Sequence, residues 1–136
     1  MIEQGVVMLV QNNPAVQAIC SHGGYWLSLP KDPTFPSWCY TVISSVTERT
    51  LDHQKLLCFE RWQLDVFSND GGDCMRLACA IDDALDHYTG ILPDPDSTLL
   101  QGAFRSDIID YFDPTIRNYR RSLEYELHFV RKSSGT

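Results

Sequence analysis

Residues 59–88 change from the hydrophobic period of a strand to that of a helix, and this change constrains the fold more than any other feature. Trp62, Leu64 and Val66 alternate with polar residues, which predicts a β-strand with one buried face. A polar run with two glycines at 68–72 interrupts the strand. Apolar residues then recur at helical spacing, which predicts a helix over residues 73–88. Its buried stripe consists of Cys74, Leu77, Ala78, Ile81, Leu85 and Tyr88. A strand followed by the helix that covers its sheet is the predicted centre of the fold.

The predicted helices carry start and stop signals. Acidic residues near the start of the 73–88 helix suit the positive end of its dipole, and Gly90 is the predicted stop. At the N-terminus, residues 2–19 predict either one helix interrupted near residues 12–14 or two short helices. Pro14 fits a first helical turn, with Asn13 as its cap.

The rest of the chain predicts strands and loops. A short strand at 25–29 precedes an extended loop at 30–36, where three prolines prevent regular pairing. Long strands are predicted at 38–48, 56–67, 99–109 and 119–132, with a turn at 49–55 that pairs the first two antiparallel and a connection at 110–118. The predicted fold class is α+β, a mostly antiparallel sheet of about four strands with helices packed on one face. We expect one domain over residues 1–132 and a flexible tail at 133–136. The expected core contains Trp62, Leu64, Leu77, Ile81, Leu85, Leu123, Tyr125 and Leu127.

The charge distribution favours protein partners over nucleic acid. The formal net charge is −7, and thirteen of the eighteen acidic residues lie between Asp52 and Asp113, whereas five of the eleven basic residues lie in the last twenty positions. Specific DNA binding is not expected, because it rests on neutralising phosphates with a broad basic face. No apolar run approaches the roughly 20 residues of a membrane span, and the N-terminal segment lacks the basic start of a signal peptide. We therefore expect no membrane partner and a protein made in the cytoplasm.

The cysteines and histidines show no ligand pattern. The five cysteines are an odd number scattered among apolar residues, which predicts buried free thiols in place of a disulfide framework. Cys74 and Cys79 would diverge by about 140° on a helix, so they do not predict a zinc site. The four histidines have no partner pattern. No metal or cofactor is predicted.

No catalytic constellation is apparent either. Asp82, Asp83 and Asp86 fit a solvated helix face, because divalent cation sites usually take several oxygens from an ordered loop. Glu60 and Asp65 point to opposite faces of one strand, which excludes them as an acid–base pair. The glycine pair at 71–72 lacks the ending of a phosphate-binding loop. We predict that the protein is not an enzyme.

Two segments carry a resemblance to a known family. Residues 60–67 (Glu-Arg-Trp-Gln-Leu-Asp-Val-Phe) with the following helix, and residues 112–125, which include Asp113-Pro114 and Tyr119-Arg120-Arg121-Ser122-Leu123-Glu124-Tyr125, resemble the central and final strands of the phage tail completion family. The N-terminal helix, the loop that ends at Pro36 and the aromatic strand with Tyr40 stand in the family's order. The chain departs from the family pattern in its five cysteines and in the loop at 91–100.

The resemblance implies a tail terminator, or head-to-tail joining protein, of a long-tailed phage, similar to the lambda tail terminator. It implies a ring of six copies that caps the tail tube, ends tube polymerisation and presents a surface to the head–tail connector. The implied partners are other copies of the chain, the tail tube protein and the connector or stopper protein, with DNA passing through the ring. The implied location is the tail or neck of the virion, after assembly in the host cytoplasm. A head-side stopper, an assembly chaperone and a small cytosolic binding module or enzyme remain alternatives.

The interface candidates lie near the end of the chain. Tyr111 and Phe112 stand in the predicted connection, which we expect to be mobile in the free subunit and ordered in the ring. Arg117, Arg120 and Arg121 are expected to face an acidic surface of the next subunit or of the tube end. The alternative is that these arginines are solvated charges at a strand edge.

Overall fold

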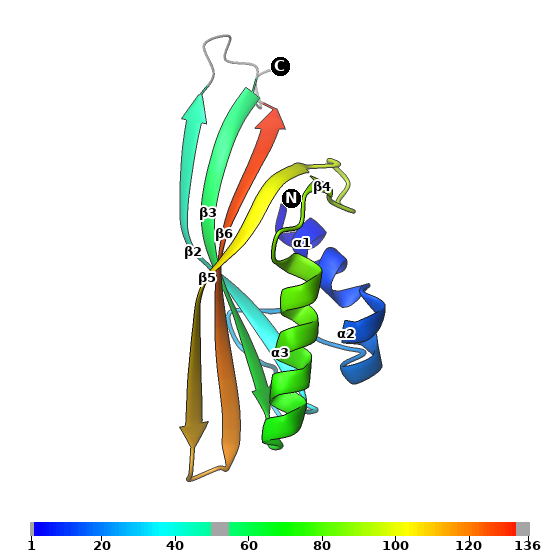
Figure 1. The fold of residues 1–136 in the computed structure, drawn as a ribbon, viewed down its shortest axis with the longest axis vertical. Coiled ribbons are helices and arrows are strands. Elements are labelled where there is room, and N and C mark those ends of the chain that lie inside the picture. Colours follow the sequence, from blue (N-terminus) through cyan, green and yellow to red (C-terminus); the bar gives the residue numbers. More distant parts are fainter. Residues whose placement is uncertain (1, 50–54, 133–136) are drawn as a thin grey trace.

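A computed structural model describes residues 2–49 and 55–132, and it shows an α+β fold (Figure 1). The described elements are α1 (Ile2–Gln11), α2 (Pro14–Ile19), β1 (Tyr25–Trp26), β2 (Ser37–Arg49), β3 (Lys55–Ser68), α3 (Gly71–Leu85), β4 (Gly90–Ile91), β5 (Leu99–Asp113) and β6 (Asn118–Lys132). Most of the turn expected at 49–55 and the whole tail expected at 133–136 lie outside the described residues.

The sheet has six strands in the order β1-β2-β3-β6-β5-β4. Neighbouring strands are antiparallel except β1, which runs parallel to β2. The short strand predicted at 25–29 is present as β1, although the expectation of about four strands did not count it in the sheet, and β4 was missed because two residues are too few to show a period. The sheet is also curled, so the prediction of helices packed on one face of it is matched only in part (Figure 1). In Figure 1 the three helices lie beside the middle and lower parts of the sheet, and the upper parts of β2, β3 and β6 extend past them.

The predicted core is confirmed. All eight expected core side chains are at most 1% exposed, and they belong to one buried cluster formed by the sheet and α3. The register explains this, because Trp62 pairs with Tyr125 and Leu64 with Leu123, so the buried faces of β3 and β6 coincide. Trp38 from β2 and Val10 from α1 extend the cluster.

The N-terminal region forms two helices. The side chain of Asn13 accepts hydrogen bonds from the first backbone N–H groups of α2, as predicted. At α3, the cap is Asp70, whose Oδ1 accepts from the N–H of Asp73 at 3.1 Å. The predicted stop at Gly90 is wrong, because α3 already ends at Leu85. The chain turns there since the N–H of His87 donates to the carbonyl of Ala103 at 2.7 Å, which ties the segment after α3 to β5.

The predicted connection at 110–118 is also wrong in its bounds. β5 continues to Asp113 and β6 begins at Asn118, so only residues 114–117 form the turn. The turn is held by the N–H of Thr115, which donates to Oδ1 of Asp113 at 2.9 Å, and Arg117 takes a positive φ of 49°. The polar residues of this segment are strand residues because their partners lie on β6, which the local sequence does not show.

The cysteines are free thiols, and four of the five are buried. Cys79 is exposed on α3, contrary to the expectation that all five are buried. The helical geometry explains the difference, because Cys74 lies on the buried stripe and Cys79 is turned away from it. No described helix is long and apolar enough to span a membrane. Within residues 2–49 and 55–132, no three His, Cys, Asp or Glu side chains are grouped to hold a metal ion.

Candidate functional site

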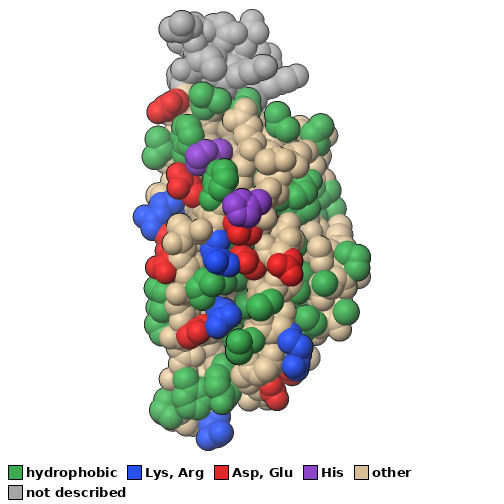
Figure 2. Space-filling view, in the orientation of Figure 1, with side chains coloured by type: hydrophobic (Ala, Val, Ile, Leu, Met, Phe, Trp, Pro, Cys, Tyr) green, Lys and Arg blue, Asp and Glu red, His purple; other side chains and the backbone are tan. Residues whose placement is uncertain are grey.

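The candidate site is the end of the β5–β6 hairpin, residues 108–121, which we call the hairpin end. Its strands run past the helices at the bottom of Figure 1, and Figure 2 shows hydrophobic side chains gathered at this end of the molecule. Five large hydrophobic side chains are exposed there, all of them between residues 108 and 116. They are Ile108, Ile109, Tyr111, Phe112 and Ile116. An apolar surface of this kind marks a site of protein contact.

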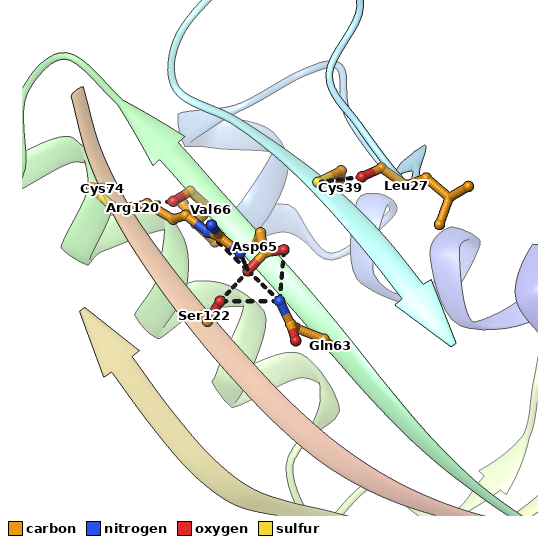
Figure 3. A network of polar contacts seen from close by, with 8 residues as sticks. All are labelled: Leu27, Cys39, Gln63, Asp65, Val66, Cys74, Arg120 and Ser122. Carbon is orange, nitrogen blue, oxygen red and sulfur yellow. Dashed lines mark hydrogen bonds and ion pairs between the residues drawn. The ribbon is translucent and has the colours of Figure 1, made fainter. Parts of the chain in front are cut away.

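Arg120 lies on the face of the sheet opposite the helices, and it pairs with Asp65 (Figure 3). Its Nε and Nη2 both lie 3.3 Å from Oδ1 of Asp65, a residue that is only 5% exposed. The same carboxylate accepts from Oγ of Ser122 and, at 3.0–3.1 Å, from Nε2 of Gln63. The guanidinium carbon also lies 4.8 Å from the ring centre of Tyr111. These contacts stabilise a buried carboxylate that would otherwise destabilise the fold.

Arg121 lies on the helix-facing side of the sheet. It donates from Nε and Nη2 to the two carboxylate oxygens of Asp110 at 2.6 and 2.9 Å. This bidentate pair lowers the pKa of the Asp110 carboxyl and raises that of the Arg121 guanidinium, chiefly through the hydrogen bonds themselves. The pair joins β5 to β6 near the end of the hairpin.

The structure does not bring the three candidate arginines together. Arg120 and Arg121 point to opposite faces of the sheet, and Arg117 lies in the exposed turn. Adjacent residues of a predicted strand must alternate, so this separation was already implied by the sequence. Arg120 and Arg121 have acidic partners within their own chain, whereas Arg117 is exposed at the tip.

A shallow pocket of about 320 Å³ lies between the hairpin end and the start of α3. Gly71 allows the close approach of α3, because a Cβ at this position would lie 3.3 Å from the Tyr119 ring. The pocket is lined by aromatic and apolar side chains together with charged ones, which suits a protein side chain. The lining residues are Gly71, Cys74, Met75, Asp110, Tyr111, Phe112, Tyr119, Arg120 and Arg121.

A second pocket, of about 540 Å³, was missed by the sequence reasoning. It lies beside β1 and is lined by Glu3, Gln4, Trp26, Leu27 and Val42. Trp26 is 66% exposed, and Leu27 has a positive φ of 68°. The sequence signal that could have found it is a tryptophan in the short segment between Gly23-Gly24 and the proline-rich loop at 30–36. A segment this short has few neighbouring side chains to bury a tryptophan.

Both pockets are open and lie at the surface, and together with the hairpin end they suit contacts with other proteins. Neither pocket is lined by a nucleophile hydrogen-bonded to a base. The buried polar groups near them, Asp65 above all, are already paired with side chains of their own sheet.

Comparisons with known proteins agree with this interpretation. The sequence model of one family, described as "Tail completion protein gp17", matches residues 4–128. Among solved structures, a chain of the "Virion of native gene transfer agent (GTA) particle" superposes with a TM-score of 0.69 at 12% sequence identity, over 96% of this chain and 95% of that chain. At this identity the likeness shows a shared fold. No curated protein matches the chain.

Proposed function

The chain belongs to the tail completion protein gp17 family, and we propose that it forms a ring that caps the tail tube of a phage-like particle and joins the tail to the head. The family match, which covers all but the ends of the chain, carries this proposal. The fold shared with a chain of a gene transfer agent virion supports it, because that particle is phage-like. The protein is thus a structural component of a tail, and its finer role is the part we propose.

A capping ring requires each copy to present different surfaces in different directions. In this chain the hairpin end exposes large hydrophobic side chains. Most of the acidic residues belong to the segment between Asp52 and Asp113. We assign the contact with the tube or with the next subunit to Tyr111, Phe112 and Arg117, which are exposed at this end. A ring of six copies, bound on one side to the tube protein and on the other to the connector, ends polymerisation because it offers the tube no further site of addition.

The proposal is tested with particles that lack this protein. Deletion of its gene should yield filled heads and separate tails of irregular length, and adding the purified protein should restore rings at the tube ends in electron micrographs. Rings bound only to heads would instead identify a stopper. A protein needed for assembly but absent from finished particles would be a chaperone, and unchanged particles would overturn the proposal.

A matched pair of variants tests the assigned surface. Phe112 and Phe104 lie on the same strand and are equally exposed, at 44%, but Phe112 lies in the hairpin end and Phe104 lies outside it, in the first half of β5. Phe112→Ala should reduce the fraction of capped tubes, and Phe104→Ala should leave it unchanged. Equal capping by the two variants would exclude Phe112 from the interface.

A further inference from the structure

Two edges of the sheet are open in the described chain. On one side, β4 pairs only with residues 99–100 of β5, and the segment after α3 bonds to residues 103 and 105. On the side away from β6, residues 107–113 of β5 therefore pair with no described strand. On the other side, β1 pairs only with residues 39–40 of β2, so residues 42–48 are open as well. Open edges of this length are templates for pairing with another chain.

The outward backbone groups follow from the bonds already made. On β5 the N–H of Arg105 donates to Asp86 and that of Ile108 to the Asp107 side chain, so both point away from β6. With the alternation of a strand, residues 108, 110 and 112 point outward. On β2 the carbonyl of Tyr40 accepts from the N–H of Leu27, so the backbone groups of Tyr40 point away from β3. Through the register with β3, Ser45 and Thr47 point the same way.

The direction of the two edges fits a repeated sheet. β2 and β5 are antiparallel to each other, because three antiparallel steps separate them in the sheet. A copy generated by rotation keeps its strand directions, so its β2 would meet β5 of the first copy in antiparallel orientation. Pairing Asp110 with Ser45 would match outward groups with outward groups. It would also set Ile109 opposite Val46, both exposed on the face away from the helices.

This pairing requires inclined strands. Within one copy, the cross-strand pairs Asp110–Arg121, Arg121–Val66 and Val66–Trp38 place Asp110 and Trp38 at the same height in the sheet. Ser45 lies seven residues after Trp38 along β2, and one of the seven is in the bulge at Ile43. That offset is about 20 Å, and the four long strands span about 19 Å across. Strands inclined by about 45° to the ring axis would bring the two open stretches to one height, an inclination close to that of closed barrels.

Charge disfavours pairing of the same edge with itself. In an antiparallel contact of two β5 edges centred on Asp110, this residue would oppose its own copy, and Asp107 would oppose Asp113. Like charges opposite each other are destabilising. The β2 edge instead offers the hydroxyl groups of Ser44, Ser45 and Thr47, which can donate to carboxylates.

The turn of the hairpin also meets a complementary surface in this arrangement. Beyond Asp113 the chain would continue past Val42 toward β1 of the neighbouring copy. The pocket lined by Trp26, Leu27 and Glu3 lies there. Ile116, which is 65% exposed, would enter this largely apolar pocket. The positively charged Arg117 would come near Glu3 in the lining of the pocket.

We propose that the open edge of β5 in one copy pairs with the open edge of β2 in the next copy, with the hairpin turn seated in the Trp26 pocket. The contact is head-to-tail, so its repetition closes a ring with one continuous sheet. The inference rests on the proposed function for the closure of the ring, and it names the surfaces that form it.

Cross-linking tests the pairing directly. In a Cys79→Ser background, which removes the exposed native thiol, the variants Ile109→Cys and Val46→Cys place one thiol on each edge. A short bis-maleimide linker tolerates a slip of the register. The full-length variants are mixed in equal amounts with and without tails that lack the native protein. We expect a covalent dimer from the mixture, a ladder of oligomers from the double variant, and no product from either variant alone. Ile109→Cys mixed with Met8→Cys, an exposed position on α1, serves as the control and should give no product.

A backbone variant gives a second measurement. Thr47→Pro removes one outward N–H of β2, whereas Thr47→Ala keeps it. Both should retain the native melting temperature within a few degrees, and only the proline variant should lose ring formation, by about tenfold or more.

The outcomes separate this inference from the proposed function. Rings at tube ends without a 109–46 product, or a product from either single variant alone, would overturn the edge pairing and leave the function intact. The expected products without capped tubes would support the pairing and overturn the function. Absence of any association, on tubes or off them, would overturn both.

Discussion

Arg121 and Asp110 join the two strands of the hairpin end through two hydrogen bonds, at 2.6 and 2.9 Å. The arginine side chain is 18% exposed and the aspartate side chain 62% exposed, so water screens the pair. The pair holds β5 against β6 at the position where the sequence predicts a loose connection. Its contribution to the free energy of unfolding is therefore modest, and its importance lies in the shape of the hairpin end.

Asp110→Asn is expected to lower the free energy of unfolding by about 0.5–1 kcal/mol at pH 7. The folded state lowers the pKa of Asp110, so the stabilisation is present above the unfolded pKa of about 3.9 and is lost as the pH falls through the folded value. Urea unfolding at pH 7 and pH 2.5 measures the difference. It should be smaller at the lower pH, and the exposed Asp83→Asn should show little effect at either pH. An effect of Asp110→Asn that does not change with pH would contradict the pairing.

Arg120→Gln should be more destabilising than Arg117→Gln, because Arg120 is a partner of the buried Asp65 and Arg117 is exposed in the turn. We expect a loss of about 1–3 kcal/mol for Arg120→Gln, moderated by the bonds from Gln63 and Ser122 that remain. Thermal unfolding of both variants checks the order. Charge reversal of the tip in assembly experiments is therefore best made as Arg117→Glu. Equal stability of the two glutamine variants would refute the role given to the Asp65 pair.

Tyr125→Phe should lower the free energy of unfolding by about 1–2 kcal/mol. The buried hydroxyl of Tyr125 donates to Oδ1 of Asp82 at 2.7 Å, and Arg105 remains as a partner of that carboxylate. Burial raises the pKa of Tyr125 well above its usual value, with the Asp82 bond as a further cause. This stabilisation is full below the unfolded pKa of about 10 and is lost as the pH rises above it. Alkaline absorbance titration should show one tyrosine that ionises only on unfolding, and Tyr111→Phe, at an exposed position, should leave that tyrosine unchanged.

Thiol reactivity should divide the cysteines into one and four. Cys79 is exposed and is expected to react rapidly in the native protein, whereas the four buried thiols should react only after unfolding. Burial, with the nearby Asp65 as a lesser cause, raises the pKa of Cys39 to about 11, which further suppresses its thiolate. Titration with a chromogenic disulfide should count one group before and five after denaturation. Persistence of the rapid reaction in Cys79→Ser would contradict this assignment.

Leu123→Ala should cost about 2–5 kcal/mol, because the side chain is 1% exposed and lies opposite Leu64 in the core. Ile116→Ala is the matched surface change in the hairpin turn and should stay within about 0.5 kcal/mol. Chemical denaturation of the two variants tests the phase of β6. An unchanged stability of Leu123→Ala would show that the strand has the wrong face inward.

The sequence alone determined the strand–helix centre of the fold, the inward face of β6 and the cap of α2. These features depend on neighbours a few residues apart, so the hydrophobic period and capping residues are sufficient to predict them. The order of motifs also resembled the family to which the chain belongs. The alternation of the predicted strand also places Arg120 and Arg121 on opposite faces of the sheet.

Only the tertiary structure decided the length of β5, the end of α3 and the burial of Asp65. Each depends on a partner distant in the sequence: β6 extends β5 through residues 110–113, Ala103 fixes His87 after α3, and Arg120 with Ser122 stabilises Asp65. The two open edges were likewise invisible in the sequence, because an edge is defined by which strand fails to pair with it. Local patterns specify what a segment can form, and long-range pairing determines where it ends and which of its groups remain for a partner.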